Sequence, residues 1–110
     1  MEYFVIGERE IILAFRLVGV QGSVVANRTE ALDSFNRIIG RGGTFSVPSS
    51  ERPKILILTE SVSAMIEDEV ISWQKCAEYP LIVEIPGIQG RLEGKKSLSD
   101  AIREAVGIQV

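Results

Sequence analysis

Short apolar runs recur along the chain and predict four strands. They read YFVIG at 3–7, SVVA at 23–26, KILIL at 54–58 and LIVEI at 81–85. Each is rich in β-branched or aromatic residues and is followed by a turn signal or a helical pattern, as strands usually are. The KILIL run has no polar alternation, which is typical of a parallel strand covered on both faces.

Between these runs the apolar residues fall at helical spacing and predict three helices. The first covers 8–18, the second starts after Asn27 and ends before Gly42, and the third runs from Thr59 to Ala77. Asn27 with Glu30 forms a capping box, and Thr59 is a candidate N-cap. The expected buried stripes are Ile11, Ile12, Phe15 and Val18; Ala31, Leu32, Phe35, Ile38 and Ile39; and Val62, Ile66, Val70, Trp73 and Ala77.

The alternation of strands and helices predicts the fold class. It indicates an α/β protein with a small, open, four-stranded parallel sheet of the doubly wound, Rossmann-like kind, with helices on both faces. Residues 1–85 form this body. The polar segment 42–53, which contains two glycines and two prolines, is predicted to be a loop.

The end of the chain follows a different pattern. Residues 86–97 are glycine-rich and predict a flexible linker, and Ser97 with Asp100 forms a capping box for a helix within 98–110. A helix shorter than roughly 12 to 15 residues needs packing to persist. Its apolar stripe is Leu98, Ala101, Ile102, Ala105 and Val106. This stripe could cover its own sheet or another chain, and the long linker favours another chain.

Composition narrows the function classes. The formal net charge of −3 gives no general attraction to nucleic acid or anionic lipid, and no run is long enough to predict a membrane span. The chain has no histidine and a single cysteine, Cys76, which excludes an internal disulfide, a multi-Cys/His zinc site and a histidine triad. Cys76 lies near an apolar stripe and is expected to be buried.

The predicted strand ends carry no recognisable cofactor motif. Strand one is followed by Gly7, Glu8, Arg9 and Glu10, where a dinucleotide site needs further glycines, and no G-x-x-x-x-G-K-[ST] motif is present. A receiver-type phosphorylation site would need an aspartate at the end of strand three, where Thr59 stands. We therefore expect no cofactor, no metal and no catalytic residue.

Several blocks of the sequence together resemble the F subunit of the A-type and V-type rotary ATPases. These blocks are IGEREIILAFRLVGV (6–20), ILILTESVSAMI (55–66), YPLIVEIPG (79–87) and LEGKKSLSDAIREAVGI (92–108). They occur in order from the first strand to the last helix. One departure is the segment 42–53, which is longer than is usual in that family.

The resemblance implies a non-catalytic rotor subunit at the cytoplasmic side of a membrane complex. Its partner would be the coiled-coil D subunit of the central stalk, with further contacts to the catalytic A and B subunits and the stalk-to-membrane connector. We expect the C-terminal stripe to bind the partner helix. Arg16, Glu8, Thr59 and Glu60 are expected to add polar contacts from an exposed face of the body.

Two other function classes remain open at this stage. The first is a receiver-like or cofactor-binding signalling domain, for which an acceptor aspartate or a glycine-rich turn would be the distinguishing feature. The second is a small enzyme that uses carboxylates alone, because the absence of a motif is weak evidence against catalysis.

Overall fold

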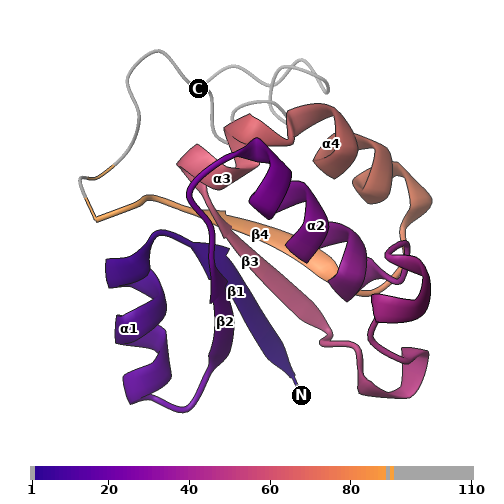
Figure 1. Cartoon of the computed structure of the whole chain (residues 1–110), viewed down its shortest axis with the longest axis horizontal. Helices are drawn as coiled ribbons and strands as arrows, with labels where there is room; N and C mark the ends of the chain where they lie inside the picture. The colour runs from indigo at the N-terminus through magenta and orange to yellow at the C-terminus, as the bar shows by residue number, and fades with distance from the viewer. Residues whose placement is uncertain (1, 89, 91–110) are drawn as a thin grey trace, which may run out of the picture.

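The computed structural model describes residues 2–88 and residue 90. They form one layered α/β body (Figure 1). The strands are β1 (Tyr3–Gly7), β2 (Gln21–Val24), β3 (Ile55–Thr59) and β4 (Leu81–Ile85). The helices are α1 (Arg9–Leu17), α2 (Arg28–Ile39), α3 (Glu60–Met65) and α4 (Glu67–Cys76), and two short 3₁₀ turns occupy Gly43–Phe45 and Ser49–Glu51.

The four strands form a parallel sheet in the order β2-β1-β3-β4. Tyr3 pairs with Ile55, which pairs in turn with Leu81, so these three side chains form one row across the sheet. Val5, Ile57 and Val83 form the next row. The predicted α/β class and its four parallel strands are confirmed.

The helices are divided unequally between the two faces of the sheet. Helix α1 packs beside β1 and β2, whereas α2, α3 and α4 lie together over the opposite face (Figure 1). The main core lies under these three helices and includes Phe4, Ile6 and Leu56 from the sheet. On the other face, Ile12 of α1 is fully buried next to β2, but Val18, which the predicted stripe also included, is 77% exposed, so that part of the prediction was wrong. Helices therefore cover both faces of the sheet, but in the described part of the chain α1 is the only helix on its face.

The predicted position of strand two was wrong, because β2 starts at Gln21 rather than at Ser23. The preceding turn needs only Gly19, whose φ is +86°. Gly22 lies inside the strand, where an added Cβ would come within 2.6 Å of the Val5 carbonyl oxygen and 3.0 Å of a methyl group of Ile12. Its missing side chain therefore allows α1 to approach the sheet closely.

The predicted third helix is broken into α3 and α4. Ile66, between them, leaves helical geometry with φ −126° and ψ 35° and is fully buried. The break lets Val62, Ile66, Val70 and Trp73 all face the core, as the stripe predicted. Ala77 does not, because it is exposed in the left-handed conformation that ends α4. Thr59 is at the N-cap position of α3, but its side chain makes no capping hydrogen bond.

Two other boundaries agree more closely with the prediction. Helix α2 starts after Asn27, whose side chain accepts a hydrogen bond from the Glu30 N–H at 2.9 Å, and ends at the left-handed Gly40. The segment 42–53 is a loop, within which the two 3₁₀ turns lie. The predicted helix within 98–110 and most of the 86–97 linker, namely 89 and 91–97, fall outside the described residues.

Candidate functional site

The carboxyl ends of β1 and β3 adjoin at the point where the sheet order reverses, which is the usual ligand position in an open α/β sheet. Protein side chains fill this position. The Ser61 hydroxyl donates a hydrogen bond to Oε1 of Glu8, and the Thr59 and Ser61 hydroxyl oxygens are 3.4 Å apart. A Cβ added to Gly7 would lie 2.7 Å from a Thr59 methyl group. The backbone at this edge is therefore closed to a pyrophosphate by its own side chains.

The predicted polar contact residues at this edge differ in exposure. Glu8 is partly buried, Thr59 is fully buried and Glu60 is 4% exposed. The expectation that Thr59 and Glu60 belong to an exposed face of the body is therefore wrong. Both residues sit at the junction of β3 and α3, where the Thr59 side chain packs against Gly7 of β1. Contact between these residues and a partner stays a prediction.

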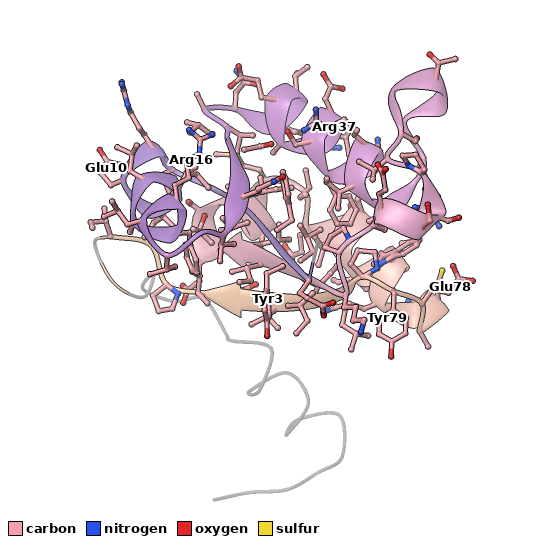
Figure 2. All side chains as sticks on the ribbon, turned by 90° about the horizontal axis from the view of Figure 1, so that it is seen from below. Tyr3, Glu10, Arg16, Arg37, Glu78 and Tyr79 are labelled. Carbon is pink, nitrogen blue, oxygen red and sulfur yellow. The ribbon has the colours of Figure 1, made fainter. Side chains whose placement is uncertain are left out.

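An apolar part of the sheet lies on the side that carries α1. Here Tyr3, Leu81 and Val83 are 48%, 51% and 42% exposed, and Ile55 and Ile57 are partly buried beside them. Figure 2 shows Tyr3 projecting from the sheet on the side away from α2. We call these five residues the open sheet face. Contiguous exposed apolar side chains of this kind often mark a binding surface.

The open sheet face was not predicted from the sequence. The unbroken run of β3 predicted a strand covered on both faces, and LIVEI was treated as an ordinary strand. Among the described residues, however, α1 is the only helix on this side, and it packs on β1 and β2. The sequence did contain a signal for this exposed surface. It predicts a single short helix between the first two strands, and such a helix cannot also cover the third and fourth strands.

Arg16, the remaining predicted contact residue of the body, is exposed on α1. Its Nη2 lies 3.4 Å from the carbonyl oxygen of Gly22, a long hydrogen bond. Arg37 of α2 reaches the same strand, where its Nη2 lies 3.3 Å from the Ser23 hydroxyl. Figure 2 labels both arginines, one on each of the helices that flank β2. Arg37 was not among the predicted site residues, because nothing in its local sequence distinguishes it.

A groove of about 480 Å³ lies between these two arginines. Its other lining residues include Phe4, Val20, Gln21 and Ser23. None of the described residues that line it is acidic. The groove follows β2, which is an edge strand of the sheet, so it opens where a neighbouring molecule could reach it.

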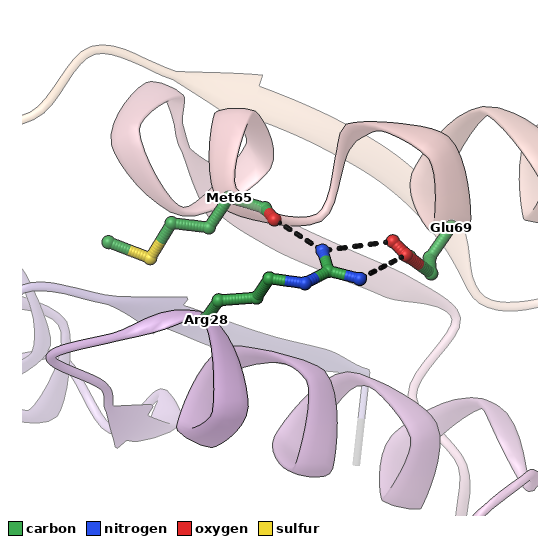
Figure 3. Close-up of polar contacts among 3 residues, drawn as sticks. All are labelled: Arg28, Met65 and Glu69. Atoms are coloured by element: carbon green, nitrogen blue, oxygen red, sulfur yellow. Dashed lines mark hydrogen bonds and ion pairs between the residues drawn. The ribbon is translucent and has the colours of Figure 1, made fainter.

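A second arginine pairing holds the helices of the main core together. Arg28 of α2 donates a 2.6 Å hydrogen bond from Nη1 to the Met65 carbonyl oxygen at the break between α3 and α4 (Figure 3). The same guanidinium contacts Glu69 through two bonds of 3.2 Å. The hydrogen bond and charge of Arg28 lower the pKa of Glu69, and Glu69 raises the pKa of Arg28. This contact is structural, because it ties three helices of one layer together.

Cys76 is exposed, so the prediction that it is buried is wrong. It lies in the last turn of α4, where its thiol is 3.5 Å from the Ser72 carbonyl oxygen and 3.9 Å from Nη2 of Arg41. Trp73, one turn earlier, takes the buried position and donates from Nε1 to the Pro80 carbonyl oxygen at 2.8 Å. The helical phase that buries Trp73 turns Cys76 outward.

Within residues 2–88 and residue 90, no group of three or more Cys, Asp or Glu side chains is placed to hold a metal ion. No helix in the same part of the chain is long and apolar enough to cross a membrane.

Comparison with known proteins gives consistent matches over almost the whole sequence. Residues 4–106 match the family model described as ATP synthase (F/14-kDa) subunit. The F subunit of the A-type ATP synthase of Methanocaldococcus jannaschii is 30% identical, with 100% of this chain and 99% of that protein covered. The F subunit of the V-type ATP synthase of Clostridium perfringens is 26% identical, with 96% and 91% covered. The A-type F subunit of Thermoplasma acidophilum is 28% identical, with 96% and 91% covered.

Proposed function

The chain belongs to the family of the ATP synthase (F/14-kDa) subunit, and from this membership we propose that it is a non-catalytic rotor subunit of the central stalk of an A/V-type ATPase. In this role it binds the coiled-coil D subunit. It turns with the stalk beneath the catalytic A and B subunits, and its contacts help to couple ATP hydrolysis or synthesis to ion movement. It lies on the cytoplasmic side, close to the protein that connects the stalk to the membrane.

The observation that carries the proposal is the family match over residues 4–106, which spans both the body and the predicted C-terminal helix. The body adds support. Its strand ends are filled by Glu8, Thr59 and Ser61, which leaves no backbone cradle there for a phosphate. In the proposed role the ATP and magnesium sites of the machine lie in other chains, and the surface of this one serves for contact.

We assign the anchoring contact to the apolar stripe Leu98, Ala101, Ile102, Ala105 and Val106. A short amphipathic helix gains its stability by burying such a stripe against another helix. Burial of a large aliphatic side chain contributes about 1.5–3 kcal/mol, so the three largest members could hold the segment in place. Arg16 and Glu8 of the body supply polar contacts in this arrangement.

The open sheet face supports a second contact with the D subunit. Tyr3, Leu81 and Val83 form an apolar surface on a chain whose net charge is negative. A helix of the coiled coil can lie across these side chains beside α1 and remove them from water. Such an arrangement gives the body a grip on the stalk that does not depend on the C-terminal segment.

The test is binding of purified variants to the purified D subunit. Ile102→Glu places a charge in the stripe and should weaken binding by about tenfold or more while the body stays folded. Arg103→Glu is the matched control, because Arg103 is the next residue along the chain but falls outside the stripe. It should bind within about threefold of the wild type. Undiminished binding of Ile102→Glu contradicts the assignment of the stripe as the anchor.

Val83→Lys tests the second contact in the same assay. It should weaken binding without lowering the melting temperature appreciably, because Val83 is already 42% exposed. Normal binding by this variant would contradict the second contact and would mean that something else, such as a segment of this same chain, covers the open sheet face.

A further inference from the structure

We propose that the groove between Arg16 and Arg37 is a docking site for a carboxylate-bearing segment of a partner protein. Two guanidinium groups approach β2 from opposite faces of the sheet, one from α1 and one from α2. This proposal rests on the proposed function only in that the function provides a partner protein. Its residues and its charge are properties of this chain.

Neither arginine is neutralised in the part of the chain that the structure describes. Arg16 contacts the Gly22 carbonyl oxygen at 3.4 Å and Arg37 contacts the Ser23 hydroxyl at 3.3 Å, and both partners are uncharged. Asp33 lies one helical turn before Arg37 but forms no ion pair with it. By contrast, Arg28 on the same helix is paired with Glu69. The two arginines therefore keep their strongest hydrogen-bonding capacity for an anion.

The local charge of the groove differs from that of the whole chain. The chain has a formal charge of −3, yet none of the described residues that line this groove is acidic. Carboxylates that enter the groove could accept hydrogen bonds from the two guanidinium groups, because both arginines line it. Their attraction is stronger beside the buried ring of Phe4, which also lines the groove, than in open water.

The apolar surroundings of Arg16 indicate what kind of molecule carries the carboxylates. The residues that follow Arg16 are Leu17 and Val18, which are 89% and 77% exposed, and Leu13 on the preceding turn of α1 is 51% exposed. These residues do not line the groove itself but adjoin Arg16 along α1, and exposed apolar residues next to an arginine are characteristic of protein interfaces. A free anion would make no use of them. The occupant is therefore a protein segment with acidic residues next to apolar ones.

The outward edge of β2 is partly covered by Arg16. The Val25 N–H donates to the Gly7 carbonyl oxygen, and because successive residues of a strand turn their backbone groups to opposite sides, Gly22 and Val24 direct theirs away from β1. Arg16 already covers the Gly22 carbonyl oxygen. Side-chain carboxylates, rather than an added strand, are thus the groups that the site is arranged to bind.

The test is rebinding of the purified chain to a rotary complex that has been stripped of it. Arg16→Glu/Arg37→Glu should weaken rebinding by about tenfold or more at low salt, and the wild type should lose more affinity on addition of salt than the variant does. Arg9→Glu makes the same kind of charge change at the opposite end of α1 and should stay within about threefold of the wild type. Equal rebinding of the double variant and the wild type overturns the proposal.

Cross-linking makes the test independent of the stability of the variants. A photoreactive residue at Gln21, which lines the groove, should couple to a partner peptide that contains aspartate or glutamate. Coupling only to peptides without acidic residues would overturn the proposal. The proposal would also be overturned if inorganic phosphate saturated the groove and yet had no effect on rebinding. The site would then hold a free anion only. If the wild type fails to rebind at all, the proposed function itself fails.

Discussion

Arg28 and Glu69 form a two-bond ion pair between α2 and α4, and the same guanidinium donates to the Met65 carbonyl oxygen (Figure 3). That carbonyl lies at the break between α3 and α4, next to Ile66. Arg28 thus provides a hydrogen bond where the regular helix stops. The pair connects the three helices that cover the main core.

The first prediction concerns the pH dependence of this contact. Arg28 lowers the pKa of Glu69 from its ordinary value of 4.5, so the ionised carboxylate favours the folded state. This stabilisation is fully present above the ordinary pKa and is lost as pH falls through the lowered folded value. Glu69→Gln should therefore lower the midpoint of urea unfolding at neutral pH. The difference from the wild type should shrink under acid.

Glu67→Gln is the matched control, because Glu67 is an exposed glutamate in the first turn of the same helix and is not paired with Arg28. Its effect should be smaller at neutral pH. Equal effects of the two substitutions would show that the helix end, rather than Arg28, accounts for the stabilisation.

The second prediction concerns the close approach of α1 to β2. Gly22→Ala should destabilise the fold by about 1–3 kcal/mol, the usual range for overpacking a well-packed site. The added methyl group would meet Val5 and Ile12, both of which are fully buried. Chemical denaturation of Gly22→Ala and Ser23→Ala, compared side by side, checks this expectation. Equal stabilities would contradict the packing described here.

The third prediction concerns the two faces of the sheet. Leu58→Ala should cost about 2–5 kcal/mol of unfolding free energy, because Leu58 is fully buried in the main core. Leu81→Ala should cost about 1 kcal/mol or less, because Leu81 is half exposed. Equilibrium unfolding of both variants tests the asymmetry. A large cost at Leu81 in the isolated chain would mean that the open sheet face is covered in solution.

The fourth prediction concerns Cys76. Because its thiol is exposed on the last turn of α4, a maleimide reagent should label it in the folded protein at a rate close to that in urea. Protection by more than about a hundredfold, as expected for a buried thiol whose exposure requires unfolding, would contradict this placement.

The elements of the body could be predicted from the sequence because each of them has a strong local cause. The capping box at Asn27 and the stripe around Phe35 placed α2 almost to the residue. The apolar runs located β1, β3 and β4 to within one residue. These signals are local in the chain, so they can be recognised without knowledge of the fold.

The errors have tertiary causes. The break at Ile66 coincides with a contact from Arg28, which is distant in sequence, and the position of β2 depends on the packing of Gly22 against Val5. The burial of Thr59 and Glu60, and the groove beside Arg37, arise only when the strands take the order β2-β1-β3-β4. Periodicity along the chain contains no information about that order.

The most direct test of the proposed role is the affinity of the isolated wild-type chain for the purified D subunit of the stalk, measured by titration calorimetry. We expect a one-to-one complex with a Kd in the micromolar range or tighter, and a negative heat-capacity change from burial of apolar surface. No detectable heat and no co-elution at concentrations well above this range would contradict the proposed role.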